Sequence, residues 1–180
     1  MKPSLAWTLA AIASLGFLVA MVIDGALPEQ RNRVKFEARG VMTLAPERID
    51  RVEIERGAAR VALARTGSSG WSAESGKALP PPDAAKVSLA VQYMHTAGPV
   101  RAMKPEEVRG VASAEFGLAP PELSVALFAG PERVLQARFG RRNAEDLLQY
   151  MSIDGRDDLF LMSRFVGQQW DASLEAARAR

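Results

Sequence analysis

The sequence predicts an α+β protein, in which an apolar N-terminal helix precedes a small domain of mainly antiparallel hairpins with two packed helices. Residues 5–23 form an uncharged apolar run, which indicates the first helix. Later segments alternate apolar and polar residues, as half-buried strands do, and two others repeat apolar residues at helical spacing. Short turns separate the strands, so we expect antiparallel pairing, because parallel pairing needs long crossovers.

The composition limits the classes of function. A chain of 180 residues has room for one domain and an anchor, and its 24% of charged residues is typical of globular proteins. The chain has no cysteine, which excludes disulfides, thiolate metal sites and thiol nucleophiles. Residues 36–180 carry equal numbers of basic and acidic side chains. Because nucleic-acid-binding domains are usually basic, we expect no nucleic-acid partner.

The run at residues 5–23 predicts a single transmembrane helix surrounded by membrane lipid. A helix of this length spans about 28 Å, close to the thickness of the hydrocarbon layer. A short cytoplasmic tail, residues 1–4, precedes it. A cleaved signal peptide is the alternative, but Asp24 occupies a position where cleavage needs a small uncharged residue. Four small residues would let a partner helix approach closely: Ala10, Ala13, Ser14 and Gly16.

The rest of the chain is predicted to lie outside the cytoplasm, because long C-terminal domains translocate largely regardless of charge. Residues 24–46 contain prolines and glycines without sustained periodicity, which predicts a tether, although residues 34–44 could pair as an edge strand. The extracytoplasmic α+β domain is then expected at residues 47–170, and residues 171–180 are expected to fray.

The first half of the domain predicts a hairpin and a helix. Residues 51–56 and 60–65 alternate apolar and charged side chains around a Gly-Ala turn. After three prolines, Asp83 is the expected N-cap of an amphipathic helix that ends near Gly98. Residues 105–108 predict a second, short helix.

The second half predicts two hairpins and a helix. Residues 123–128 and 134–139 flank one turn, and residues 148–153 and 159–162 flank another. Ser163 is the expected cap of a final helix. A hairpin followed by a helix thus occurs twice, which suggests an internal duplication. A ferredoxin-like domain, as found in membrane subunits of secretion systems, is the alternative architecture.

The order of several short motifs resembles a known family, the bacterial domain of unknown function 4340. The matching residues span roughly 47–170 and are Trp71, Leu79-Pro80, Asp83-Ala84-Ala85, Phe116-Gly117-Leu118-Ala119-Pro120-Pro121, Phe139-Gly140 and Tyr150. Phe116 departs from the family pattern, which usually has Tyr there. The resemblance implies a membrane-anchored extracytoplasmic protein, often associated with ABC-type transport systems. It implies no catalytic residues.

Few residues are candidates for chemistry. His95 is the single histidine and has no partner at metal or triad spacing, so we interpret it as an exposed or helix-end residue. The acidic residues at 154–158 lack the ligand spacing of a calcium loop and predict a hairpin turn. A basic group could contact lipid phosphates or an acidic partner, namely Arg138, Arg141 and Arg142, although a solvated strand end explains them as well.

These observations predict a non-catalytic accessory or assembly subunit of a multi-subunit complex in the bacterial inner membrane, such as a transporter. Its partners would be integral membrane proteins, its domain would lie in the periplasm, and no cofactor or metal is expected. A periplasmic module that binds a lipid, glycan or peptide in a groove beside the helix at residues 83–94 is the alternative. A hydrolase or metal enzyme would need partners for the single histidine that the sequence lacks.

Overall fold

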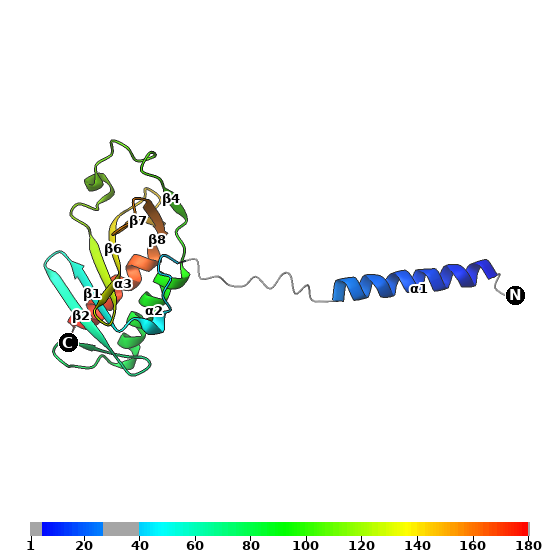
Figure 1. Ribbon diagram of the computed structural model, residues 1–180, viewed down its shortest axis with the longest axis horizontal. Coiled ribbons are helices and arrows are strands. Elements are labelled where there is room, and N and C mark those ends of the chain that lie inside the picture. The colour runs from blue at the N-terminus through cyan, green and yellow to red at the C-terminus, as the bar shows by residue number, and fades with distance from the viewer. Residues whose placement is uncertain (1–4, 27–39, 180) are drawn as a thin grey trace. The chain divides into compact units, whose positions relative to one another are not determined.

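The computed structural model describes residues 5–26 and 40–179 (Figure 1). It divides into an N-terminal unit, which contains helix α1 (Leu5–Ala26), and a compact domain, which contains the other described elements. α1 has 22 residues, and each of its side chains that the structure describes is exposed. Counting only the residues that the structure describes, no helix is long and apolar enough to cross a membrane.

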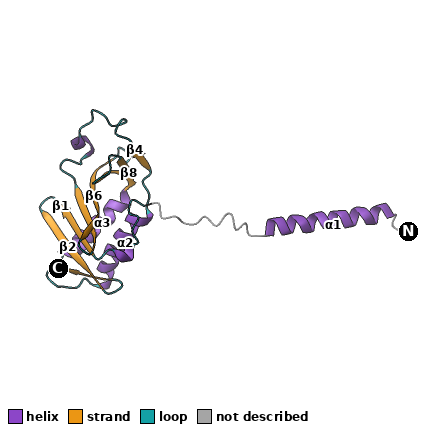
Figure 2. Ribbon diagram, viewed as in Figure 1, coloured by secondary structure: helices purple, strands orange, loops and turns teal. Residues whose placement is uncertain are grey.

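The domain consists of one antiparallel sheet and two helices that cover a single face of it (Figure 2). The strand order is β3-β2-β1-β5-β6-β7-β8-β4. The strands are β1 (Arg51–Arg56), β2 (Ala59–Thr66), β3 (Gly70–Ala73), β4 (Arg101–Met103), β5 (Leu123–Ala129), β6 (Glu132–Arg142), β7 (Leu148–Ile153) and β8 (Leu159–Ser163). The helices are α2 (Pro81–Thr96) and α3 (Arg164–Arg178), with short 3-10 turns η2 (Pro46–Arg48) and η3 (Ser113–Phe116).

Two meanders make up most of the sheet, and each leads into a helix. Strands β1, β2 and β3 form a meander that leads outward from the centre of the sheet into α2, and strands β5 to β8 form a second meander that leads outward into α3. β1 and β5 pair at the centre, where Val52 lies opposite Leu127 and Ile54 lies opposite Val125. The predicted α+β class with antiparallel pairing is therefore confirmed.

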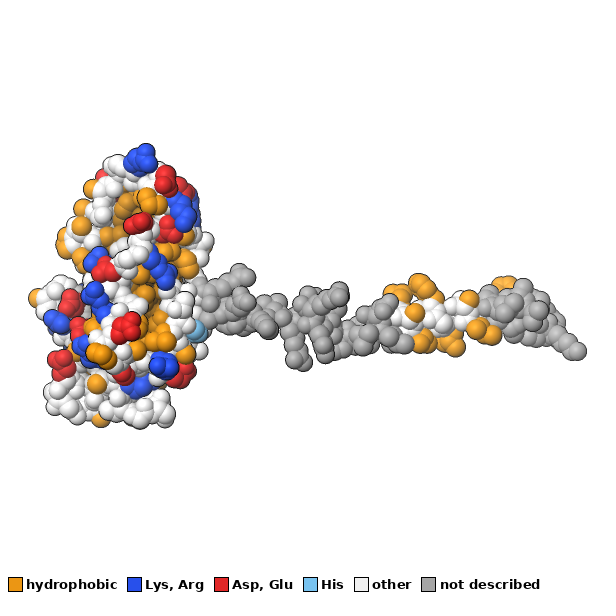
Figure 3. All heavy atoms as spheres, viewed as in Figure 1, with side chains coloured by type: hydrophobic (Ala, Val, Ile, Leu, Met, Phe, Trp, Pro, Cys, Tyr) orange, Lys and Arg blue, Asp and Glu red, His pale blue; other side chains and the backbone are white. Residues whose placement is uncertain are grey.

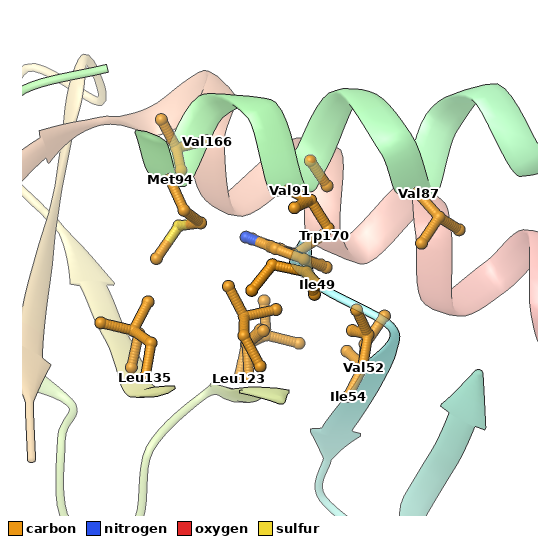
Figure 4. Packing of buried hydrophobic residues seen from close by; sticks show 14 of the residues in the cluster. Ile49, Val52, Ile54, Val87, Val91, Met94, Leu123, Leu135, Val166 and Trp170 are labelled. Carbon is orange, nitrogen blue, oxygen red and sulfur yellow. The ribbon is translucent and has the colours of Figure 1, made fainter. Parts of the chain in front are cut away.

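The main core lies between the sheet and the two helices (Figure 4). Alternate residues of the strands point toward the helices, because side chains of a strand alternate between the two faces. Val52 and Ile54 of β1 and Leu123 of β5 meet Val91 of α2 and Trp170 of α3 in this layer. All five are at most 2% exposed, so the two helices share one continuous core.

A second, smaller apolar cluster covers part of the opposite face. Met103, Leu118 and Leu159 are its buried members, and Phe116 and Tyr150 pack against them. The segment between β4 and β5 supplies Phe116 and Leu118, so the end of this long connection is folded onto the sheet, whereas most of residues 104–115 are exposed.

Several predicted boundaries need correction. Asp83 is not the N-cap of α2, because the helix begins at Pro81 and Pro80 occupies the cap position. The short helix predicted at residues 105–108 is a series of turns, and the 3-10 turn η3 follows it instead. β3 was not predicted as a strand, since it has only four residues.

The predicted tether and C-terminal tail also differ from the structure. Residues 27–39 of the predicted tether lie outside the described residues, but Val41 and Met42 are buried in the main core, so the domain begins before residue 47. Residues 171–180 do not fray as a whole, because α3 continues to Arg178. Leu174 is fully buried on α3, and this apolar contact stabilises the last helical turns.

Candidate functional site

A groove runs along α2. It consists of two adjoining cavities of about 440 and 580 Å³. Both cavities are lined by Ser69, Ser88 and Gln92, so they are continuous with each other. The first cavity is polar, and its remaining lining residues are Ala45, Pro46, Glu47, Arg65, Ser68, His95 and Thr96. The second is mainly apolar, with Gly70, Leu79, Pro81, Ala84, Ala85 and Leu89.

Arg65 of β2 supplies a fixed cation to the polar cavity. Its Nε donates to the Ile49 carbonyl at 2.6 Å, and its Nη2 donates to the Pro46 carbonyl at 2.9 Å. The guanidinium also lies over the Trp71 ring, 4.5 Å from the centroid. Burial lowers the pKa of Arg65, and the nearby Glu47 carboxylate opposes this shift. Within the described chain, the hydrogen bonds of Arg65 all go to carbonyl oxygens, so no carboxylate neutralises it by contact.

One hydrogen bond joins the two elements, β3 and α2, that separate the groove from the core. The Nε1 of Trp71 donates to the Ser88 hydroxyl at 2.9 Å, which joins β3 to α2 across the groove floor. Trp71 is fully buried, whereas Ser88 is half-buried and reaches both cavities. The position of α2 relative to β3 is therefore set by a core residue, and the groove is pre-formed.

His95 lies at the polar end of the groove, in the last turn of α2. It is half-buried rather than exposed, and its Nδ1 lies 3.0 Å from the Met42 carbonyl. The Gly40 amide donates to the His95 carbonyl at 3.0 Å, and the Met42 amide donates to the Met94 carbonyl at 2.8 Å. The segment that enters the domain thus caps the C-terminal carbonyls of α2, which otherwise lack partners. The helix-end interpretation of His95 holds, and its role is to secure this segment.

The three arginines predicted as a basic contact patch all lie on β6, and each is already engaged. The contacts are Arg138 with the Asp154 carboxylate at 2.8 Å, Arg142 with the Asp146 carboxylate at 3.0 Å, and Arg141 with the Ala114 carbonyl at 3.2 Å. The hydrogen bond from Arg142 lowers the pKa of the Asp146 carboxyl. On the face in Figure 3, cations and anions are likewise interspersed. The structure does not gather these arginines into a free cationic surface, and their contact with a partner stays a prediction.

The structure also shows where the predicted turn and most of the predicted helix-contact residues lie. Residues 154–157 form the turn between β7 and β8, with Gly155 at a φ of 79°, as the hairpin interpretation requires. Among the described residues, no group of three or more metal-ligating side chains comes together. Ala13, Ser14 and Gly16 are exposed on α1, and the side chain of Ala10 lies outside the described set.

The sequence pattern did not predict Arg65 or the serines as site residues. A signal for Arg65 was present, because it lies four residues after Val61 and two after Leu63 and so shares their core-facing side of the strand. A charged residue on the core side of a strand is a reason to expect a special environment. Ser69 and Ser88 carried no such signal, since only the packing of α2 against β3 brings them together.

Comparisons with known proteins add no relatives. No protein-family model matches the chain, no curated protein matches it, and no solved structure matches it. The resemblance to the bacterial family named above therefore stays a prediction.

Proposed function

We propose that this chain is a non-catalytic accessory subunit of a complex in the bacterial inner membrane, with its domain in the periplasm. The apolar helix at residues 5–23 would anchor it, and the groove along α2 would contact a partner subunit. The observation that carries the proposal is the groove itself, in which a polar and an apolar cavity adjoin on two rigid elements. Recesses of this size with a few polar groups are typical binding sites.

The exposed side chains of α1 support the anchor. Trp7 is 75% exposed, and apolar residues follow all along the helix, including Ile12, Leu15, Phe17 and Leu18. Apolar side chains lie on more than one side of the helix (Figure 3). A helix that is apolar all round is stable only when lipid or protein covers it. The small residues Ala13 and Gly16 would then allow close contact with a partner helix.

The test is purification of the full chain from native membranes through a C-terminal tag in mild detergent, with mass spectrometry of the proteins that co-purify. We expect integral membrane partners in stoichiometric amounts. Ala85→Trp should reduce their recovery, because Ala85 is exposed and lines the apolar cavity. The matched control is Ala58→Trp, on the exposed β1–β2 turn, which should leave recovery unchanged.

Two results would overturn the proposal. The protein could emerge alone from membranes of the native host, or it could leave the membrane on washing with alkaline carbonate. Replacement of Ala13 and Gly16 by Leu tests the helix contact separately, and unchanged complex formation would remove that contact from the proposal.

The second candidate function is a binding module for a small lipid or glycan. The apolar cavity of about 580 Å³ favours it, because this volume suits a ligand of drug-like size. Native mass spectra of the purified protein distinguish the two functions, since a retained small molecule supports the module and an empty protein argues against it.

The repeated path of the chain supports a duplication of one meander-and-helix unit. β1 and β5 are the first strands of their meanders and pair side by side, and α2 and α3 end the two units and pack together. This arrangement is what two fused copies related by a two-fold axis would produce.

A further inference from the structure

Arg65 and the apolar cavity lie in one continuous groove, and together they restrict what can bind there. We propose that the groove binds an extended peptide segment of the partner, which places a carboxylate on Arg65 and an apolar side chain between Leu79 and Leu89. This inference rests on the proposed function and names the chemistry of the partner segment.

The position of Arg65 favours a carboxylate. The guanidinium is held by backbone carbonyls and by the Trp71 ring, so its orientation is set before any ligand arrives. Among the described residues, its hydrogen bonds involve one N–H on each nitrogen, which leaves the second N–H of each Nη atom for a further acceptor. A pre-oriented guanidinium binds a carboxylate with little loss of side-chain entropy.

Three neighbouring groups oppose an anion, and each is weakened. Asp50 acts on Arg65 by its charge, but it is exposed and its carboxylate already accepts a hydrogen bond from the Gly130 amide at 2.6 Å. Glu47 is the one acidic residue among the described lining residues, but it is exposed and therefore screened by solvent. The C-terminal end of α2 carries partial negative charge. The amides of Gly40 and Met42 already satisfy two of its carbonyls, which lowers that charge. The half-buried Arg65 therefore dominates the polar cavity.

The lining favours a peptide over a lipid. A lipid chain needs a continuous apolar surface, whereas Ser69, Ser88 and Gln92 interrupt the groove where its two cavities join. Hydroxyl and amide groups can both donate and accept hydrogen bonds, as an extended peptide backbone requires. Beyond this junction, Leu79, Ala84 and Leu89 supply an apolar pocket for one side chain.

The experiment uses the full chain in detergent micelles and fluorescein-labelled octapeptides, with fluorescence anisotropy as the readout. Each peptide carries one Leu and one Asp, separated by one to four Ser or Gly residues, and a matched set has Lys in place of Asp. We expect at least one acidic peptide to bind, and its Lys counterpart to bind about 10- to 100-fold more weakly.

Four variants locate the site. Arg65→Gln should weaken the acidic peptide about tenfold or more, and Glu47→Gln should strengthen it by removing repulsion. Arg60→Gln is the matched control, because it removes one arginine from the opposite face of the same strand. It should leave affinity unchanged. Ala85→Trp should block binding while the circular dichroism spectrum stays that of the parent, which keeps the test valid if Arg65→Gln fails to fold.

Equal binding of the Asp and Lys peptides, or no effect of Ala85→Trp, would overturn the inference. Its failure is distinct from failure of the proposed function. If membrane partners co-purify equally with the parent and with Ala85→Trp, the accessory function stands and the peptide groove falls. If acidic peptides bind but no membrane partner co-purifies, the groove chemistry stands and the accessory function falls.

Discussion

The core contains two tryptophans, and only one of their indole N–H groups has a hydrogen-bond partner among the described residues. Trp71 and Trp170 are both fully buried. Trp71 donates to the Ser88 hydroxyl, whereas the Nε1 of Trp170 has no hydrogen-bond partner among the described residues. A buried donor without a partner costs about 1–3 kcal/mol, so Trp170 is retained for the apolar contact that its ring makes with both layers of the core.

The two tryptophans therefore respond differently to the same substitution. Trp71→Phe loses a hydrogen bond and leaves Ser88 without its donor, whereas Trp170→Phe removes the unsatisfied group. We expect Trp71→Phe to lower the free energy of unfolding by about 1 kcal/mol more than Trp170→Phe does. Urea denaturation followed by far-UV circular dichroism, in the same detergent, measures both. Equal losses would show that the Trp170 N–H is satisfied in solution.

At the scale of elements, the segment from Gly40 to Leu44 is the least expected part of the domain. It pairs with the last carbonyls of α2, and the Arg156 guanidinium donates to the Val41 carbonyl at 2.7 Å. Gly40 lies so close to the His95 carbonyl group that a Cβ atom would overlap with it. The segment can therefore pack against the end of α2 in this way only because residue 40 has no side chain.

Gly40→Ala should lower the free energy of unfolding by about 1–3 kcal/mol, because the added methyl group forces the segment away from α2. Val41 and Met42 would then lose part of their burial. Hydrogen exchange of peptides covering residues 40–44 should become faster. Gly16→Ala is the matched control, since no described residue lies within 4 Å of a Cβ atom added at that position on α1. If Gly40→Ala leaves both stability and exchange unchanged, the segment is not held as described.

Other element-level features follow from similar close contacts. The sequence motifs at Phe116-Gly117 and Phe139-Gly140 lie against each other, since a Cβ on Gly140 would overlap with the Phe116 carbonyl. The periodicity of the sequence predicted most strands correctly, because alternation reports which face is buried. The periodicity could not predict that Gly117 and Gly140 lie against each other, because the two residues are distant in sequence and neither belongs to an apolar–polar alternation.

At the scale of the whole molecule, the distribution of apolar surface differs between the two units. The domain buries most of its large apolar residues in two clusters, whereas the described side chains of α1 are exposed. This contrast motivates the proposed anchor, and the absence of cysteine gives a direct means of testing its topology.

A single cysteine introduced at Ala58, on the exposed β1–β2 turn, should react with a membrane-impermeant maleimide in intact spheroplasts, because we propose that the domain lies in the periplasm. A single cysteine at Ser4, in a separate variant, should react only after lysis. Gel shifts of the labelled protein measure both. Labelling of residue 4 alone in intact spheroplasts would reverse the orientation, and equal labelling of both before lysis would argue against an anchor.

The sequence by itself determined the α+β class, the antiparallel hairpins, the approximate extent of α2 and the turn at Gly155. These features depend on neighbouring residues, whose periodicity and turn preferences are local. The same reasoning underestimated α3, because its last turns are stabilised by the burial of Leu174 and the neighbouring alanines rather than by local preference.

Only the tertiary structure decided the docking of residues 40–44, the second apolar cluster and the lining of the groove, whose place beside α2 was an expectation from the sequence. Each of these joins residues far apart in the chain, such as Arg65 with Ile49 and Trp71 with Ser88. The groove forms where α2 packs against β3, whereas the second cluster forms on the opposite face of the sheet. Local sequence reports which side of an element is buried, but it does not report which element buries it.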